Sequence, residues 1–295
     1  MTMTEYKPSA KDVQELRQRT GAGMMDCRNA LTAANGDMNL AIENLRKSGI
    51  AKAEKRAGRV ASEGRIVVNM APDNKSASIL ELNSETDFVS RNDDFAAVAD
   101  ALGKALFATD FDGIVADATG GAFLSTPFEG KTIADKVTET SAKTGENVVL
   151  RRYARLTTDG TLGTYIHHNG RVAVIVDVAG QGPQAQELAK TVAEHVAAGV
   201  PRVPEAVTRE EVPTDIVERE RRIFSEKAVA EGKPANIVDK VVEGQIRKFF
   251  AEITLLEQPW VRDESRTIQQ LVDEASKSAG APLTVKRFVR YRMGE

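Results

Sequence analysis

One succession of patterns occurs twice in the chain: two alternating segments joined by a turn, followed by a helical segment. The first copy covers residues 64–106, with its turn at Pro72. The second covers 163–198 and has a hairpin signal at Asn169-Gly170, because this dipeptide suits the positive φ angles of a tight turn. Alternation with a period of two predicts strands, and a period near 3.6 predicts a helix. The repetition therefore predicts an α+β fold with two tandem, related subdomains.

The first fifty residues have a helical pattern. Apolar residues at helical spacing begin at Val13, at Cys27 and at Leu40, and glycine-containing breaks separate the three runs. We expect the third helix to end near Gly49. Residues 1–50 are therefore predicted to form a three-helix module whose core is near the lower size limit for independent folding.

A basic segment, residues 51–64, follows the predicted module. Lys52, Lys55, Arg56 and Arg59 outnumber its two glutamates. Such a segment either contacts a nucleic acid or an acidic protein, or forms a solvated linker helix between domains. Basic stretches of this length are commonly solvated helices, so we favour the linker.

The rest of the chain is expected to form core subdomain N, residues 65–146, and core subdomain C, residues 147–295. Subdomain C begins with a strand at 148–156 and is interrupted by a helical hairpin, residues 204–253, with short heptad character. The hairpin either packs against its own core or forms an oligomer or partner contact, and the pattern leaves both open. A strand at 283–292 is expected to complete the second sheet.

Groups capable of catalysis or metal binding are scarce. The chain has one cysteine, three histidines and no G-x-x-x-x-G-K-[ST] phosphate-binding motif. One cysteine excludes an internal disulfide and leaves too few thiols for a structural zinc site. His167 and His168 are adjacent on an expected strand, so we expect them to point to opposite faces and to bind no metal together. We expect no catalytic residue, no metal and no cofactor.

Charge and hydropathy limit the partners and the location. Lysine and arginine total 40 against 43 aspartate and glutamate, and the resulting charge of −3 disfavours extensive contact with nucleic acid. No run of about 18 apolar residues occurs in the sequence. The first residues lack the apolar core of a secretory signal. We expect a cytoplasmic protein with no membrane span and no direct nucleic-acid partner.

Phe88 is a large apolar residue in a segment that otherwise has the composition of a turn. Residues 83–92 (NSETDFVSRN) lie between an expected buried strand and a helix, and Thr86 and Asp87 are typical of a helix cap. Phe88 either packs into the local core beside the next helix or is exposed and enters a pocket of a partner. Spacing alone favours the buried alternative, because aromatic side chains are more often buried.

Several motifs resemble those of the bacterial translation elongation factor Ts family. They are TGAGMMDC from Thr20, the 52–64 stretch, ETDFV from Glu85, QPWV from Gln258 and RFVR from Arg287. The resemblance covers nearly the whole chain. It implies a ubiquitin-associated-like module at 1–50, two related α+β core subdomains and a coiled-coil hairpin. It also implies a non-enzymatic guanine-nucleotide exchange factor for elongation factor Tu, and it makes the exposed alternative for Phe88 the favoured one.

The resemblance further implies which residues contact the partner. Near the magnesium site of the GTPase they are Thr86, Asp87, Phe88 and Val89; at a surface helix of the same GTPase domain they are Arg17, Met24, Met25 and Val261; and at a second partner domain the contact is His167. Phe88 would act as a wedge that displaces magnesium and disturbs the phosphate-binding loop. GDP would then leave and GTP would rebind.

Two other functions and one assembly remain open at this point. The basic stretch could bind RNA or the ribosome, which would require steeply salt-dependent binding. A pocket between the subdomains could hold a small-molecule substrate, although no acid, base and nucleophile converge in the pattern. Dimerisation through the 204–253 hairpin is also left open.

Overall fold

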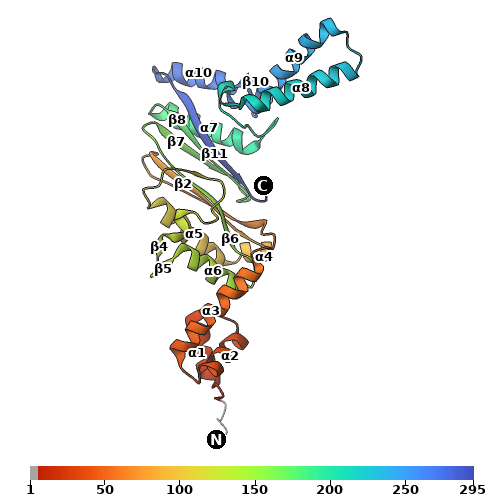
Figure 1. Cartoon of the computed structure of the whole chain (residues 1–295). Coiled ribbons are helices and arrows are strands. Elements are labelled where there is room, and N and C mark those ends of the chain that lie inside the picture. The colour runs from red at the N-terminus through yellow and green to blue at the C-terminus, as the bar shows by residue number, and fades with distance from the viewer. Residues whose placement is uncertain (1–5) are drawn as a thin grey trace. The chain divides into compact units, whose positions relative to one another are not determined.

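Three helices form the N-terminal part of the described chain, which covers residues 6–295 of the computed structural model (Figure 1). α1 (Ala10–Thr20) begins where the Ser9 side chain accepts a hydrogen bond from the Asp12 amide. It ends at Gly21, which is left-handed at φ 68°. α2 (Met24–Ala33) and α3 (Met38–Arg56) follow. Their common core consists of Val13, Leu16, Cys27, Ala30, Leu31, Ala34 and Ala41. The prediction of three N-terminal helices is confirmed.

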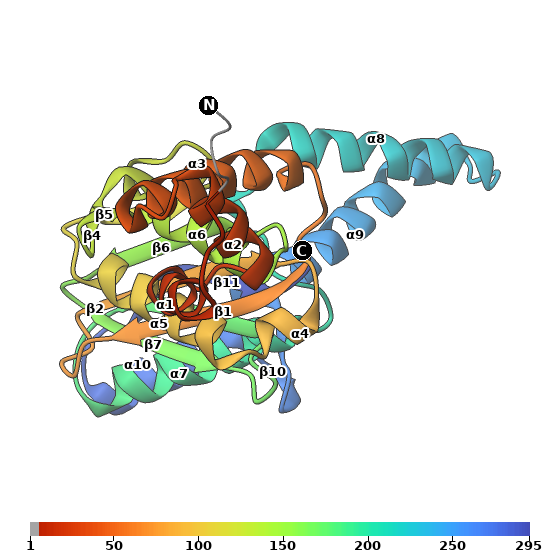
Figure 2. The ribbon, with the colours of Figure 1, turned by 90° about the horizontal axis from the view of Figure 1, so that it is seen from below.

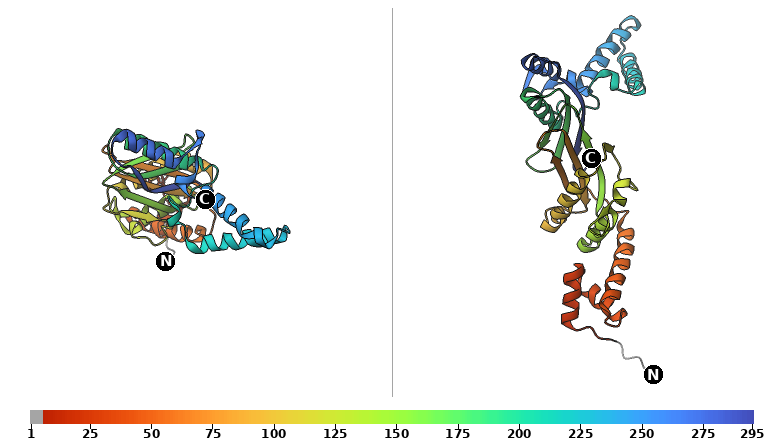
Figure 3. Two further views of the ribbon diagram at one scale, coloured as in Figure 1. Left: turned by 90° about the horizontal axis from the view of Figure 1, so that it is seen from above. Right: turned by 90° about the vertical axis from the view of Figure 1, so that its left-hand side faces the viewer.

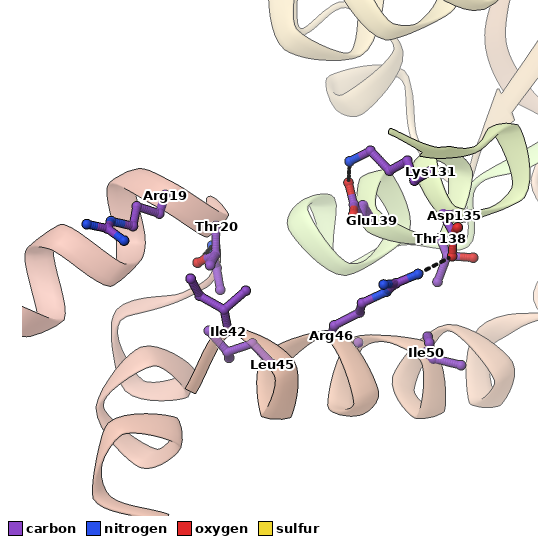
Figure 4. Close-up of a pocket in the computed structure, with 12 residues that line it drawn as sticks. Arg19, Thr20, Ile42, Leu45, Arg46, Ile50, Lys131, Asp135, Thr138 and Glu139 are labelled. Atoms are coloured by element: carbon purple, nitrogen blue, oxygen red, sulfur yellow. Dashed lines mark hydrogen bonds and ion pairs between the residues drawn. The ribbon is translucent and has the colours of Figure 1, made fainter. Parts of the chain in front are cut away.

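The expected end of the third helix near Gly49 is wrong, because α3 continues to Arg56. A Cβ atom on Gly49 would lie 3.2 Å from the Cβ of Ala142, on α6 (Ile133–Thr144). Glycine at this position lets two helices approach closely and does not end the first of them. Figure 4 shows α3 beside α6, joined by an ion pair of 3.0 Å between Arg46 and Asp135.

The described chain forms two units. The first comprises the described residues up to Val67, Leu80–Ala154 and Met293–Glu295, and the second comprises Val68–Ile79 and Arg155–Arg292. The predicted segmentation into 1–50, 51–64, 65–146 and 147–295 follows different boundaries and stays a prediction.

A four-stranded sheet with the order β1-β2-β6-β3 lies largely in the first unit. The strands are β1 (Glu63–Met70), β2 (Ser76–Ser84), β3 (Gly113–Val115) and β6 (Val149–Thr157). α5 (Asp93–Phe107) and α6 pack on it, and the core includes Leu82 from β2, Phe95 from α5 and Ile133 from α6 (Figure 1). Shorter elements complete the unit: α4 (Asp87–Ser90), a 3-10 turn at Ala122–Ser125, β4 (Pro127–Phe128) and β5 (Lys131–Thr132).

β6 belongs to the sheet of the first unit. β6 is hydrogen-bonded between β2 and β3, and its Leu150 and Tyr153 lie in the core of the first unit. The ring centroid of Tyr153 is 5.2 Å from that of Phe123, which supplies a specific aromatic contact within this core. Alternation along β6 fixes which residues are buried, but it carries no information about which strands are its neighbours.

The second unit contains an antiparallel sheet with the order β11-β8-β7. The strands are β7 (Thr161–Ile166), β8 (Val172–Ala179) and β11 (Thr284–Arg292). β7 and β8 form the predicted hairpin, and Gly170 in its turn has φ 68°. α7 (Pro183–Ala198) and α10 (Ile268–Ala279) contribute Val192 and Leu271 to its core. The predicted α+β class and the repeated strand–turn–strand–helix order are confirmed.

Two long helices form the predicted helical hairpin in the second unit. α8 (Thr214–Ala230) and α9 (Ala235–Ile253) run side by side in Figures 2 and 3 and bury Ala228, Val242 and Ile246 between them. The remaining elements are 3-10 turns at Arg209–Glu211 and Leu255–Glu257, β9 (Pro259–Trp260) and β10 (Asp263–Thr267). Within residues 6–295, none of the helices has both the length and the apolar character needed to cross a bilayer.

Replacing glycine by alanine is expected to change the free energy of unfolding in opposite directions at two positions of the second unit. A Cβ on Gly163 of β7 would lie 2.6 Å from the Cβ of Ala189 on α7, whereas a Cβ on Gly244 of α9 would meet nothing within 4 Å. We expect Gly163→Ala to lower the free energy of unfolding by about 1–3 kcal/mol through overpacking. We expect Gly244→Ala to raise it by about 0.5–1 kcal/mol, because alanine favours a helix. Urea unfolding of both variants checks this, and a stable Gly163→Ala variant would contradict the close packing of α7 on β7.

Candidate partner-binding site

Phe88 is exposed on a short helical turn that follows β2. Phe88 is 85% exposed, the largest exposed fraction among the large apolar residues described between 6 and 295. Thr86 caps this turn, α4, by accepting a hydrogen bond from the Val89 amide at 3.4 Å. Val89 packs against the core of the first unit. The turn therefore buries one apolar side chain and presents the next one to solvent.

The capping residue of this turn is held by a carboxylate that follows α6. Glu146 Oε2 accepts hydrogen bonds from the backbone amides of Glu85 and Thr86 at 3.1 and 3.0 Å. Glu146 Oε1 accepts a hydrogen bond from the Thr86 hydroxyl at 2.5 Å. Hydrogen bonds to a carboxylate are stronger than those between neutral groups, so one side chain fixes two consecutive residues.

A second carboxylate makes the reciprocal contact. Glu85 Oε1 accepts a hydrogen bond from the Asn147 amide at 2.6 Å and one from the Arg59 guanidinium at 3.3 Å. Asn147 Nδ2 donates to the carbonyl of Arg59 at 2.8 Å. The segment before Phe88, the segment after α6 and the basic segment thus meet in one hydrogen-bonded cluster.

Asp87 is the most exposed acidic group at the turn. Its carboxylate forms an ion pair with Arg91 at 3.1 Å, one helical turn further along, and its side chain is about half exposed. An exposed pair of this kind contributes little to stability. The carboxylate of Asp87 is therefore accessible to a partner at small cost.

Two methionines and an arginine share a second surface in the first unit. Met24 and Met25, at the start of α2, are 59% and 63% exposed, and Arg17 on α1 is exposed as well. They line one hollow together with Pro8, Ala10, Val13, Gln14 and Arg28. Flexible thioethers adapt to the shape of an apolar partner surface. The structure thus brings Arg17, Met24 and Met25 together on one face.

Val261 lies in the second unit and is held by a buried histidine. The Val261 amide donates a hydrogen bond to His195 Nδ1 at 3.3 Å. His195 Nε2 lies 2.9 Å from Gln258 Oε1, and Gln258 Nε2 donates to the carbonyls of Arg202 and Glu252. Because Gln258 uses its amide nitrogen elsewhere, its oxygen must accept from His195, which places the proton of the neutral imidazole on Nε2. Burial lowers the pKa of His195 and so favours this neutral form.

This histidine predicts a pH dependence of stability. An unfolded histidine has a pKa of about 6.5, and the pKa of folded His195 is lower. Below pH 6.5 the unfolded chain binds more protons than the folded chain, so the free energy of unfolding falls as the pH falls toward the folded pKa. We expect the melting temperature to decrease between pH 7.5 and 5.5, with a shallower slope for His195→Asn. His168→Gln, which changes an exposed histidine, should keep the wild-type slope, and equal slopes in all three proteins would contradict the assignment.

His167 lies in the turn between β7 and β8, and its position corrects one expectation. The rings of His167 and His168 do not point to opposite faces, because both residues lie beyond the end of β7 and their centroids are 4.2 Å apart. His167 Nδ1 is 3.2 Å from the Tyr165 hydroxyl. Among residues 6–295, no three His, Cys, Asp or Glu side chains are grouped in a way that could hold a metal ion.

Comparison with known proteins gives the family. The family model described as elongation factor TS matches residues 85–295. Elongation factor Ts of Clostridium botulinum (strain Alaska E43 / Type E3) is 44% identical over 290 residues, which cover 97% of this chain and 93% of the relative. That of Prosthecochloris aestuarii is 42% identical over 97% of this chain and 98% of the relative. The chain belongs to the elongation factor Ts family. A member from Clostridium perfringens (strain SM101 / Type A) is 41% identical over the same share of this chain.

The residues that the resemblance to elongation factor Ts implies are divided between the two units. Thr86, Asp87, Phe88, Val89, Arg17, Met24 and Met25 belong to the first unit, and Val261 and His167 belong to the second. The structure also identifies Glu146 and His195, which the sequence analysis did not select. Neither lies in a recognisable motif, and each acts on residues that are distant in sequence.

Proposed function

We propose that this chain is a guanine-nucleotide exchange factor that binds elongation factor Tu in its GDP form and accelerates the release of GDP. Membership of the elongation factor Ts family supports the translation role and the partner. The single structural observation that carries the mechanism is the exposure of Phe88 on a turn that Glu146 holds in place. The chain acts as a binding protein and not as an enzyme, needs no cofactor, and works in the cytoplasm where translation takes place.

Phe88 is the wedge in this proposal. Burying a phenylalanine side chain in a partner pocket contributes about 1.5–3 kcal/mol of binding free energy. This contribution stabilises only the conformation of the partner in which the pocket is open. By reciprocity, a protein that prefers the nucleotide-free conformation weakens nucleotide binding by the same factor. Insertion of Phe88 displaces the magnesium ion and disturbs the phosphate-binding loop. GDP then leaves, GTP rebinds, and the overall GDP/GTP equilibrium is unchanged.

The other residues that the family resemblance implies hold the turn or contact the partner while Phe88 inserts. Asp87 enters beside Phe88, and Thr86 and Val89 keep the turn in shape through its cap and its core contact. The methionine surface with Arg17, Met24 and Met25 contacts a surface helix of the GTPase domain, and Val261 lies against the same helix. His167 reaches a second domain of the partner.

The basic segment serves as a linker in this proposal and not as a nucleic-acid site. Three of its four cationic side chains have partners within the chain: Lys52 pairs with Asp26 at 2.8 Å, Arg56 donates to the Ser141 carbonyl at 3.2 Å, and Arg59 contacts Glu85. Charges engaged in this way are less available to phosphate groups. The ubiquitin-associated-like identity of the first module and a dimer through residues 204–253 stay predictions of the family resemblance and of the helical pattern.

The release of labelled GDP from purified elongation factor Tu tests the proposal. We expect a substoichiometric amount of the chain to accelerate the release many-fold, while the equilibrium ratio of bound GDP to bound GTP stays the same. A release rate that does not depend on the concentration of the chain would refute the exchange function.

A further inference from the structure

We propose that Glu146 is a positioning residue for nucleotide exchange, because its carboxylate sets the turn that carries Phe88 before the partner arrives. This inference rests on the proposed exchange function and adds a residue from outside the ETDFV motif. Glu146 touches neither Phe88 nor Asp87 in any of the hydrogen bonds described. It acts through Glu85 and Thr86, the two residues that lead into the turn.

The turn needs the contact with Glu146 because it has little stability of its own. α4 has four residues, and a helix of that length has no independent stability. Phe88 is exposed and Asp87 has only an exposed ion pair, so neither side chain anchors the turn to the core. Val89 anchors the turn by apolar contact, the Glu146 carboxylate by three hydrogen bonds, and the buried Ser84 by a hydroxyl that donates to the Thr86 carbonyl at 3.1 Å.

The hydrogen bonds form a reciprocal clasp, defined here as Glu85, Thr86, Glu146 and Asn147. Each of the two segments, 85–86 and 146–147, supplies one carboxylate that accepts hydrogen bonds from backbone amides of the other. Glu146 accepts from the amides of Glu85 and Thr86, and Glu85 accepts from the amide of Asn147. A reciprocal arrangement restricts both sliding and rotation of one segment against the other. The segment after α6 is itself fixed, because the Ser141 hydroxyl donates to the carbonyl of Glu146 at 2.6 Å.

The basic linker is attached to the same clasp. Asn147 Nδ2 donates to the Arg59 carbonyl at 2.8 Å, and the buried Asn83 donates to the Ala61 carbonyl at 3.0 Å. The guanidinium of Arg59 in turn reaches Glu85. The backbone of residues 59–61 is therefore held by Asn147 of the clasp and by Asn83 of β2, which gives this part of the linker a defined course beside the turn.

A preset turn matters for the proposed mechanism because ordering a flexible segment upon binding opposes association. With the clasp intact, Phe88 meets the partner in one orientation. Without the carboxylate of Glu146, two backbone amides and one hydroxyl lose their acceptor, and the turn samples other orientations. Loss of hydrogen bonds to a charged group corresponds to roughly ten-fold or more in an equilibrium, so we expect a comparable decrease in the exchange rate.

The experiment uses the full chain with Glu146→Ala, Glu146→Gln and Glu139→Ala. The last variant is the matched control, since Glu139 lies on α6 and pairs with Lys131 on the surface. Amide hydrogen exchange at Glu85 and Thr86 is measured without the partner, and GDP release from elongation factor Tu is measured over a range of chain concentrations. Circular dichroism checks that each variant is folded.

We expect Glu146→Ala to remove the protection of the two amides and to slow GDP release about ten-fold. Glu146→Gln should keep part of the amide protection and part of the GDP-release activity, because the glutamine oxygen can still accept from the amides and the glutamine nitrogen can donate to the Thr86 hydroxyl. Glu139→Ala should match the wild type. Normal GDP release with Glu146→Ala would overturn the positioning role, and if Phe88→Ala still slowed release the exchange function would stand. Normal release with Phe88→Ala as well would overturn both the wedge role and the positioning role, whereas the exchange function fails only if the wild-type chain itself does not accelerate release.

Discussion

Phe88→Ala is expected to slow the release of GDP from elongation factor Tu by roughly ten- to a hundred-fold without altering the fold. The expected loss corresponds to the burial of one phenylalanine side chain in the partner, about 1.5–3 kcal/mol, at about 1.4 kcal/mol for each factor of ten. Phe88 contributes little to the stability of the free chain because it is 85% exposed. Its replacement should change the free energy of unfolding by no more than about 0.5 kcal/mol.

Stopped-flow release of fluorescent GDP measures the first effect, and thermal unfolding measures the second. Ile114→Ala is the matched control, because Ile114 is an exposed apolar residue of the same unit that lies outside every surface assigned to the partner. Phe88→Leu should keep much of the activity, since a wedge needs bulk more than aromatic character. An unchanged release rate with Phe88→Ala would exclude the wedge role, even if the chain still bound its partner.

Leu31→Ala is expected to unfold the three N-terminal helices while the rest of the chain stays folded. Leu31 is completely buried in a core of seven residues, and truncation of a buried leucine to alanine costs about 2–5 kcal/mol. A module of this size has little stability in excess of that. Arg17, Met24 and Met25 would lose their common surface, so binding of elongation factor Tu should weaken although Leu31 itself cannot contact a partner.

Limited proteolysis and hydrogen exchange across α1, α2 and α3 measure this local unfolding. Leu40→Ala is the control, because Leu40 lies on α3 but is 42% exposed and outside the seven-residue core. If Leu31→Ala left the exchange rates of these helices unchanged, the seven-residue core would not be what holds them together.

The sequence predicted best those features that local chemistry determines. The β7–β8 hairpin follows from Asn169-Gly170, because a glycine with positive φ is required there and alternation continues on both sides. The hairpin of α8 and α9 follows from apolar spacing on two long segments around Gly232. Each of these features is set by residues that are close together in the chain, so a single sequence contains the necessary information.

The features that the sequence did not reveal depend on contacts between distant residues. Gly49 has the sequence appearance of a helix end, but its role depends on Ala142 of another helix. The place of β6 depends on which strands pair with it, and alternation does not specify that. Glu146 has no motif at all, since its importance lies in the position of its carboxylate beside Thr86. Phe88 was assigned to the exposed class only through the family resemblance, because spacing alone favoured burial.

The interleaved course of the chain has a consequence for the order in which the molecule can be completed during synthesis. The tip of the β1–β2 hairpin, Val68–Ile79, belongs to the second unit although most of that unit is translated much later. The first unit in turn incorporates Met293–Glu295, where Met293 is buried, so its last contacts wait for the final described residues. Early strands must therefore stay unpaired on one side while later ones emerge, and such exposed edges favour aggregation. We infer that the first unit makes its final contacts only after the second unit has been synthesised.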